Sequence, residues 1–181
     1  MKPARPATPE TDLCRIRRLA SRRREENLDF RAYLKELPFS VRHIDRTVQS
    51  VLRSVTARID CTQCAHCCRE MQPVLGAVDI RRLAKATGLT SEGFSKRYLK
   101  PGPAEGTGLI FKSRPCPFLK QNRCTVYEAR PGDCRSFPHL HRREFVYRSL
   151  QACLNYGVCP IVFNTMEALK TQLATRIKAR K

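Results

Sequence analysis

The chain has 181 residues, with 35 Lys or Arg against 16 Asp or Glu, and its formal net charge is +19. This length suits one ordinary domain with an extension and excludes two large independent cores. The ten cysteines fall short of the density that marks a small secreted disulfide scaffold. The basic excess is spread over the whole chain, which favours an anionic or protein partner of unknown kind.

The compartment follows from what the sequence lacks. The opening residues, MKPARPATPETDLCRIRR, contain no apolar segment of a secretory signal. No apolar run approaches the ~18 residues that a membrane helix needs. We therefore expect a cytoplasmic protein without a membrane partner. In that reducing setting, clustered cysteines are more often metal ligands or catalytic thiols than disulfides.

The N-terminal part is expected to be helical and basic. Residues 1–12 are rich in Pro, Ala and Thr, and we expect them to be disordered. A basic helical extension follows over residues 13–59. Its first helix runs from Leu13 to Leu37 and ends before Pro38. Ser40 caps a second helix, whose apolar residues recur at threes and fours, the pattern of a helix packed on one face.

The segment 60–160 is expected to be a small, irregular, cysteine-rich metal-binding domain of the α+β class. Its predicted elements are short helices over 78–88 and 90–99, short strands over 109–112, 124–127 and 145–147, and a turn at Gln121–Asn122. The C-terminal segment 161–181 is predicted to contain a helix that begins near Asn164 and packs on the core.

The strongest motif is Cys61-Thr-Gln-Cys64-Ala-His-Cys67-Cys68. A gap of two residues lets a tight turn direct two sulfurs at one ion, and three cysteines at this spacing match the opening of a ferredoxin-type run. Cys68 directly follows Cys67, and neighbouring side chains in extended backbone point to opposite sides. The two therefore serve different centres, or one of them is not a ligand.

Five further cysteines arrive singly along the chain. They are Cys116, Cys124, Cys134, Cys153 and Cys159. Prolines near these residues restrict the backbone and pre-organise loops that lack regular hydrogen bonding, as a metal site requires. Arg130 and Arg135 flank Cys134 and are candidates for offsetting thiolate charge. Cys14 lies alone far upstream.

Five motifs in this order, CxxCxxCC, CPFL, CxVY, RPxxCRxFP and a later cysteine, resemble the YkgJ-type cysteine-cluster family. This family is a zinc- or iron-chelating domain and is related to flagellin lysine N-methylase. The resemblance covers about residues 61–159. It implies eight ligands, which here are Cys61, Cys64, Cys67, Cys68, Cys116, Cys124, Cys134 and Cys153. Cys159 departs from the pattern, so the last ligand is either Cys153 or Cys159.

The identity of the metal stays open between an iron–sulfur cluster and zinc. The ferredoxin-like run favours iron, whereas the isolated cysteines allow zinc. Histidine can replace cysteine at zinc, but enough cysteines are present already. We therefore interpret His66, His139 and His141 as surface histidines or as residues that support the ligands without binding the metal.

Three functions are compatible with these residues. The first is a metal-binding protein with a redox or structural centre. The second, by analogy with the family, is a lysine N-methylase-like enzyme that uses S-adenosylmethionine, although the chain has no GxGxxG turn after a strand. The third is a nucleic-acid-binding module that zinc stabilises. The positive net charge supports this function, but the sequence shows no aromatic stacking platform for bases. We favour the first and leave enzyme activity undecided.

Overall fold

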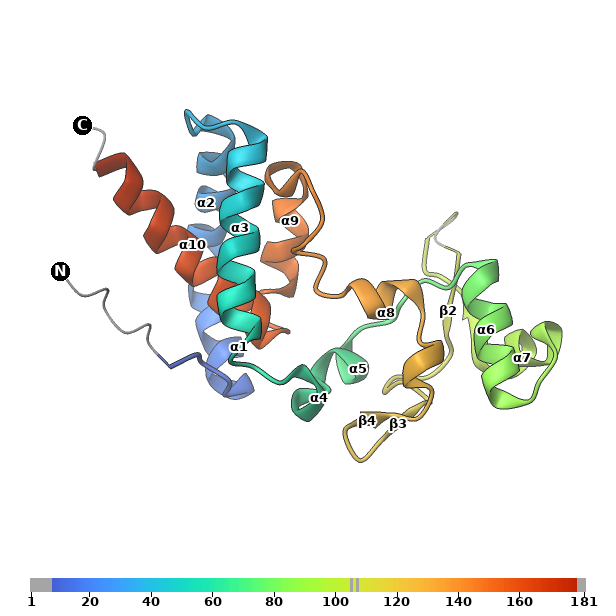
Figure 1. Cartoon of the computed structure of the whole chain (residues 1–181). Coiled ribbons are helices and arrows are strands. Elements are labelled where there is room, and N and C mark those ends of the chain that lie inside the picture. Colours follow the sequence, from blue (N-terminus) through green and yellow to red (C-terminus); the bar gives the residue numbers. More distant parts are fainter. Residues whose placement is uncertain (1–7, 105, 107, 179–181) are drawn as a thin grey trace. The chain divides into compact units, whose positions relative to one another are not determined.

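The protein is described by a computed structural model that covers residues 8–104, 106 and 108–178, with side chains up to residue 173. The chain forms two units, each of which is described by itself. The helical unit comprises Met1–Asp60 and Pro138–Lys181, and the cysteine unit comprises Cys61–Phe137 (Figure 1). Helix accounts for 61% of the structure and two small antiparallel sheets for 7%, which confirms the α+β class.

The described part of the helical unit is built from α-helices. They are α1 (Leu13–Arg22), α2 (Arg24–Glu36), α3 (Val41–Thr56), α9 (Phe145–Asn155) and α10 (Pro160–Lys178). Helix α10 packs along α3, and α2 packs along α9. Each of the five helices buries apolar side chains, from Ile16 on α1 to Leu169 and Leu173 on α10. The predicted stripes of α3 and α10 therefore pack against each other.

The N-terminal helices begin at residues whose side chains satisfy free backbone amides. The carboxylate of Asp12 accepts from Cys14 N at 2.8 Å and from Arg15 N at 3.2 Å. Ser40 caps α3, as predicted, by accepting from His43 N at 3.3 Å. The single helix predicted over residues 13–37 is divided at Arg23, whose φ of −103° and ψ of 18° depart from helical values.

Of residues 1–12, which were expected to be disordered, residues 1–7 lie outside the described part of the chain. Residues 8–12 form an irregular segment that is attached to α10. The Glu10 amide donates to Asn164 Oδ1 at 2.9 Å, and Asn164 Nδ2 donates to the Glu10 carbonyl at 2.8 Å. Asn164, which the sequence indicated as a helix cap, binds this segment instead. Helix α10 begins at Pro160, a residue suited to the first turn because it has no amide hydrogen to satisfy.

The strand predicted over residues 145–147 is wrong, because these residues begin helix α9. The start of α9 is held by Asp45, a buried residue of α3. Its carboxylate oxygens accept from Glu144 N at 2.8 Å and from Phe145 N at 2.9 Å. A partner one hundred residues away in the sequence therefore caps this helix, and local sequence patterns do not contain that information.

The cysteine unit contains shorter elements. Its helices are α4 (Cys61–Cys64), α5 (His66–Glu70), α6 (Ala77–Thr87), α7 (Ser91–Tyr98), the 3₁₀-helix η1 (Tyr127–Ala129) and α8 (Gly132–Ser136). Its strands are β1 (Leu99–Pro101), β2 (Leu109–Phe111), β3 (Leu119–Lys120) and β4 (Arg123–Cys124). Both sheets are antiparallel pairs, with Leu99 opposite Phe111 and Leu119 opposite Cys124. The helices predicted over 78–88 and 90–99 and the strand over 109–112 are confirmed. The strand predicted over 124–127 is shorter than expected, because it ends at Cys124.

The apolar core of the cysteine unit lies at the helices α6 and α7 and the β1–β2 pair. Its centre is aromatic, with the rings of Phe94 and Phe118 stacked at 6.1 Å and Phe111 edge-on to Phe118 at 5.7 Å. Cys116 and Cys124 pack against this cluster. The core thus reaches the cysteine-bearing loops through Phe118, which lies between those two cysteines in the sequence.

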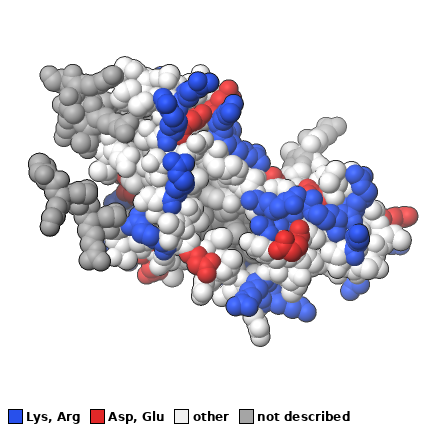
Figure 2. All heavy atoms as spheres, viewed as in Figure 1, with Lys and Arg blue, Asp and Glu red and all other residues white. Residues whose placement is uncertain are grey.

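Lys and Arg side chains dominate the charged surface of both units on the face drawn in Figure 2. In the described part of the chain, no helix is long and apolar enough to cross a membrane. This surface shows charge without a single concentrated tract, which agrees with the spread of basic residues along the sequence.

Candidate metal centre

The CxxCxxCC run forms two short helices that are separated by one residue in a left-handed conformation. Cys61 and Cys64 lie one turn apart on α4, and the Ala65 amide donates to the Cys61 carbonyl at 3.3 Å. Ala65 has a φ of 48°, so the chain turns sharply and α5 starts in a new direction. Cys67 and Cys68 then follow on α5. The predicted tight turn is thus a change of direction between two helical turns.

Cys116 and Cys124 are brought to Cys68 by backbone pairing. The Cys116 amide donates to the Cys68 carbonyl at 2.9 Å, which ties the CPFL segment directly to α5. The Leu119 amide then donates to the Cys116 carbonyl at 3.0 Å, and Leu119 pairs with Cys124 across the β3–β4 hairpin. Three cysteines from three separate segments are therefore fixed relative to one another by main-chain hydrogen bonds.

The hairpin that carries Cys124 contains the predicted two-residue turn. Gln121 and Asn122 have φ values of 47° and 64°, the combination that a tight turn between twisted antiparallel strands requires. Arg69 of α5 donates to the Asn122 side-chain oxygen and, at 3.2 Å, to the Cys64 carbonyl. Arg69 thus joins the hairpin to the CxxCxxCC run, a role that the sequence analysis did not identify.

Cys134 lies on α8, and α6 holds the segment that leads into it. Asp79 accepts from the Gly132 amide at 3.0 Å and pairs with Arg82 at 2.6 Å. Arg82 donates to the Ala129 carbonyl at 3.1 Å and to the Arg130 carbonyl at 2.8 Å. We call Asp79 and Arg82 the α6 clamp. The clamp satisfies three backbone groups of an irregular segment and so fixes the approach of Cys134 to the other cysteines.

The thiols of Cys68, Cys116, Cys124 and Cys134 share one electrostatic neighbourhood. Burial raises the pKa of Cys116 to about 11, and the nearby sulfurs of Cys68 and Cys124 add to this shift. Surrounding protein raises the pKa of Cys134 to about 12, although the residue as a whole is exposed, and the sulfurs of Cys116, Cys68 and Cys124 contribute. Burial also raises the pKa of Cys124. The Cys68 sulfur therefore disfavours ionisation of the other three thiols, and the Cys124 sulfur does the same for Cys116 and Cys134.

Cys68 behaves differently from its three neighbours. A hydrogen bond from the Cys67 thiol lowers the pKa of Cys68 to about 7, against the opposing effect of burial, and the Arg69 guanidinium adds to the lowering. The thiolate is the form that binds metal, so the lowered pKa favours Cys68 as a ligand at neutral pH. Cys68 is the side chain in this cluster that is best prepared to accept a cation first.

The donor set fits zinc or iron in its chemistry. All ten cysteines lie in the described part of the chain, and none of them forms a disulfide. Four thiols from separate segments are the ligands that zinc and iron–sulfur centres take. Among the described residues, no three His, Cys, Asp or Glu side chains already surround a point at ligand distance. The four sulfurs are thus neighbours that a metal would have to draw together.

The remaining predicted ligands lie in two places. Cys61 is exposed and Cys64 and Cys67 are half-buried, all within the cysteine unit. Cys153 and Cys159 belong to the helical unit. The Cys153 thiol donates to the Asn27 carbonyl of α2 at 3.5 Å, and Cys159 is buried just before α10. The assignment of either as the last ligand stays a prediction.

The structure also places the two basic residues that flank Cys134 and the three histidines considered as supporting residues. Arg130 stacks on the Tyr127 ring at 3.6 Å. Its charge partly offsets the rise in the pKa of Cys124 and does not contribute to the pKa of Cys134, the residue that the sequence suggested. Arg135 is exposed. His66 is buried, so it is not a surface residue, whereas His139 is half-buried and His141 is exposed. Metal binding by these histidines is not required by the cysteine arrangement.

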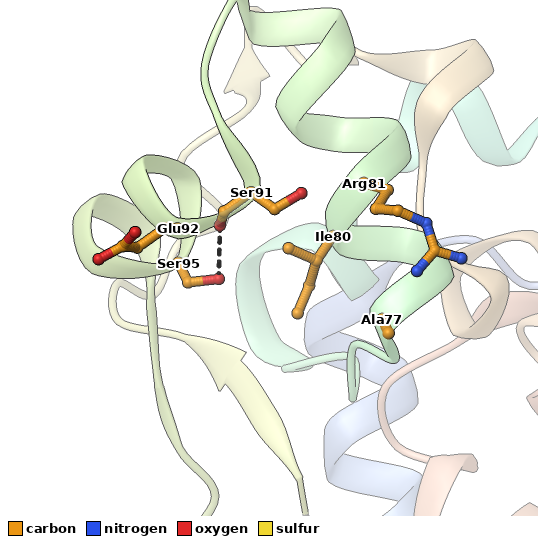
Figure 3. Close-up of a pocket in the computed structure, with 6 residues that line it drawn as sticks. All are labelled: Ala77, Ile80, Arg81, Ser91, Glu92 and Ser95. Carbon is orange, nitrogen blue, oxygen red and sulfur yellow. Dashed lines mark hydrogen bonds between the residues drawn. The ribbon is translucent and has the colours of Figure 1, made fainter.

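A depression of about 420 Å³ lies between α6 and α7 (Figure 3). It is lined by Ala77, Ile80, Arg81, Ser91, Glu92 and Ser95. The Ser95 hydroxyl is occupied by a hydrogen bond of 2.9 Å to the Ser91 carbonyl. This depression contains no cysteine and no converging polar groups, so it does not extend the candidate metal centre.

Comparison with known proteins bears on the same region. No curated protein and no solved structure matches the chain. The model of the CxxCxxCC family, described as "Putative zinc- or iron-chelating domain", matches residues 60–156, which is 97 of the 181 residues. This range includes the whole cysteine unit and the four neighbouring thiols. The chain therefore belongs to the CxxCxxCC family of zinc- or iron-chelating domains.

Proposed function

We propose that the cysteine unit binds zinc or an iron–sulfur cluster through the thiolates of Cys68, Cys116, Cys124 and Cys134. The observation that carries this proposal is that the Cys116 amide is bonded to the Cys68 carbonyl and that the Cys68 sulfur lies near enough to raise the pKa of each of the other three thiols. Three links hold their four segments together: the bond from Cys116 N to Cys68 O, the β3–β4 hairpin and the α6 clamp. Membership of a zinc- or iron-chelating family supports the same chemistry.

The residues around the four cysteines would share the work of binding. Cys68, whose pKa is lowered to about 7, supplies the first thiolate. Cys116, Cys124 and Cys134 give up their protons when a cation compensates the charge, since burial and neighbouring sulfur are what keep them protonated. Arg69 and Arg130 offset the excess negative charge at Cys68 and Cys124. A bound metal supplies a cross-link between segments that are far apart in the sequence.

The role of this centre would be structural at the least. Helices α4 and α8 bury none of their residues, and α5 buries only His66. These three helices carry five of the predicted ligands and gain little from apolar burial. Thiolate–metal bonds would replace the missing core, as they do in other small domains whose metal is part of the fold.

Cys61, Cys64 and Cys67 would serve a second centre or complete a larger cluster with the first. Adjacent residues on a helix are rotated by about 100°. The Cys67 thiol nevertheless donates a hydrogen bond to Cys68, so the two sulfurs lie close together, which favours one larger cluster over the predicted separate centres. Cys61 and Cys64 lie one turn apart on α4, on the same side of that helix.

Metal analysis of anaerobically purified protein tests the proposal. We expect at least one equivalent of zinc or iron per chain, lost in a variant with Cys116→Ser and Cys134→Ser. The matched control is Cys14→Ser, since Cys14 is an exposed cysteine of the helical unit. Less than about half an equivalent of iron plus zinc in the wild-type protein would contradict the proposal.

The absorption spectrum of the same preparation distinguishes the two cofactors. Iron–sulfur ligation predicts a brown protein that absorbs near ~400 nm, whereas zinc predicts a colourless one. A colourless protein with a full equivalent of zinc would exclude the iron–sulfur alternative. A coloured protein whose colour persists in the Cys116→Ser, Cys134→Ser variant would instead show that these two cysteines do not bind the cluster.

A further inference from the structure

The outward face of α9 is apolar. The exposed residues of this helix are Tyr147, Leu150, Gln151 and Leu154. Tyr147 is 66% exposed, Leu150 44% and Leu154 65%. Their spacing of three and four places these three side chains in one stripe along the helix. Helices on a protein surface normally turn polar side chains to water, so a stripe of this kind indicates a contact surface.

Helix α2 lies along one side of this stripe. The Cys153 thiol of α9 donates to the Asn27 carbonyl of α2 at 3.5 Å, and the charge of Arg31 acts on Cys153. In projection down the axis of α9, Leu150 lies about 60° and Leu154 about 100° from Cys153, in the direction that leads from the buried side to solvent. The apolar stripe therefore starts directly beside the line where the two helices meet.

The part of α2 beside that line is basic. In projection down the axis of α2, the angle from the buried Asn27 is about 40° for Arg31, about 60° for Arg24 and about 80° for Lys35, all in the same direction. The Arg31 Nε is buried and has no hydrogen-bond acceptor among the described residues. A row of three cations thus lies beside the stripe, and one of them lacks an acceptor.

The acidic residues of α2 lie elsewhere on the helix. Glu25, Asp29 and Glu36 are about 160° to 200° from Asn27, on the opposite side. Glu26 is engaged by Lys170 of α10 at 2.6 Å. No acidic residue of α9 compensates the cations either, because the helix contains none. The local field beside the stripe is therefore positive.

We propose that the α2–α9 surface, made of Arg24, Arg31, Lys35, Tyr147, Leu150 and Leu154, docks an acidic amphipathic helix of a partner protein. The apolar face of that helix would cover the stripe on α9, and carboxylates along one edge would pair with the three cations of α2.

Other occupants fit this surface less well. A second copy of the chain would bring its own basic row against the first, and like charges at a contact disfavour association. The terminal residues 1–7 and 179–181 carry only basic charges, so they lack the carboxylates. A lipid surface favours cations on both edges of an apolar face. The other edge of this stripe carries the neutral Gln151 and also Arg148, whose guanidinium already donates to the carbonyls of His139, Arg142 and Arg143.

Synthetic helical peptides of about 18 residues test the proposal by fluorescence anisotropy with the full-length chain. One peptide carries Leu along one face and Glu along one edge, and its matched control carries Lys in place of Glu. We expect the Glu peptide to bind at least about tenfold more tightly than the Lys peptide. The variant with Arg24→Glu and Lys35→Glu should reverse this preference.

Substitutions in the apolar stripe of α9 test its part in peptide binding. The variant with Leu150→Gln and Leu154→Gln should lose at least about tenfold in affinity for the Glu peptide. Its melting temperature should stay unchanged, because both residues are exposed. The control is Val78→Gln on α6, which replaces another exposed apolar residue, 61% exposed, outside the surface. This control should leave binding unchanged.

Several results would overturn the proposal. Equal binding of both peptides, no binding, or unchanged binding by the Leu150→Gln, Leu154→Gln variant would each do so. Light scattering that finds a dimer broken by this variant would assign the surface to a second copy. Vesicles of phosphatidylserine and phosphatidylcholine that bind the wild-type chain but not this variant would assign it to a membrane.

Discussion

In the helical unit every described helix contributes apolar side chains to a shared core, whereas in the cysteine unit the apolar core stops at α6, α7 and the β1–β2 pair. Helices α4 and α8 bury nothing, and they carry Cys61, Cys64 and Cys134. Segments that bury no apolar surface need another source of stability. Hydrophobic burial stabilises the first unit, and under the proposed function thiolate ligation would stabilise part of the second.

The largest effect should follow from removal of the ligands. Structural zinc contributes on the order of 10 kcal/mol to the folding of small domains. The variant with Cys68→Ser and Cys116→Ser should therefore lose hydrogen-exchange protection in α4, α5, β3–β4 and α8. Protection in α3 and α10 should remain, because their stability comes from apolar burial. Uniform loss of protection in both units would contradict the separate origins of their stability. Unchanged protection in the cysteine unit would show that this unit needs no metal.

The converse substitution lies in the helical core. Leu169 on α10 is fully buried, so Leu169→Ala should destabilise the helical unit by about 2–5 kcal/mol. Denaturant unfolding monitored by circular dichroism measures this loss. The metal content should stay at the wild-type value. Loss of metal in this variant would mean that the two units depend on each other and would contradict the separate origins of their stability.

A smaller effect should come from the α6 clamp. Asp79→Ala removes an acceptor from the Gly132 amide and from Arg82, which costs about 1–3 kcal/mol. We expect weaker metal binding, because the approach of Cys134 is no longer fixed. Competition with a chelator of known affinity measures the change. Arg81→Ala, at an exposed neighbour on the same helix, is the control. Equal metal affinities of the two variants would show that the α6 clamp does not contribute to metal binding.

The pH dependence of metal binding should be steep. At pH 7 the raised pKa values keep Cys116, Cys124 and Cys134 protonated, so binding displaces about three protons above pH 7. Below pH 7 Cys68 is protonated as well, which adds a fourth. Affinity should therefore rise with pH, by about 1.4 kcal/mol per proton and pH unit. Chelator competition across this range tests the sign. A flat profile would show that the thiols are not the ligands.

Local patterns in the sequence predicted the elements whose determinants are local. The cap at Ser40 and the stripe of α3, the helices α6 and α7 and the turn at Gln121–Asn122 depend on residues close in the chain. Helix α9 was missed, because Tyr147, Leu150 and Leu154 leave it without a polar face and its cap, Asp45, lies on another helix. The surface feature that misled the prediction is the same one that suggests a partner.

The candidate site was predictable in its chemistry but not in its assembly. The CxxCxxCC spacing indicated thiolate ligation, and the order of the motifs indicated the family, which the comparison confirms. The grouping of Cys68 with Cys116, Cys124 and Cys134 depends on long-range bonds such as Cys116 N to Cys68 O and Gly132 N to Asp79. No sequence period encodes such pairs. Asp79 at the third position of α6 resembled an ordinary N-terminal helix residue.

X-ray absorption at the zinc or iron edge of the purified protein tests the central claim most directly, because it reports the atoms bound to the metal. The account predicts a shell of sulfur at about 2.3 Å, with four sulfurs per metal ion if the metal is zinc. The Cys116→Ser, Cys134→Ser variant should lose this metal or replace sulfur by oxygen. A wild-type shell made only of nitrogen and oxygen would contradict ligation by the four cysteines.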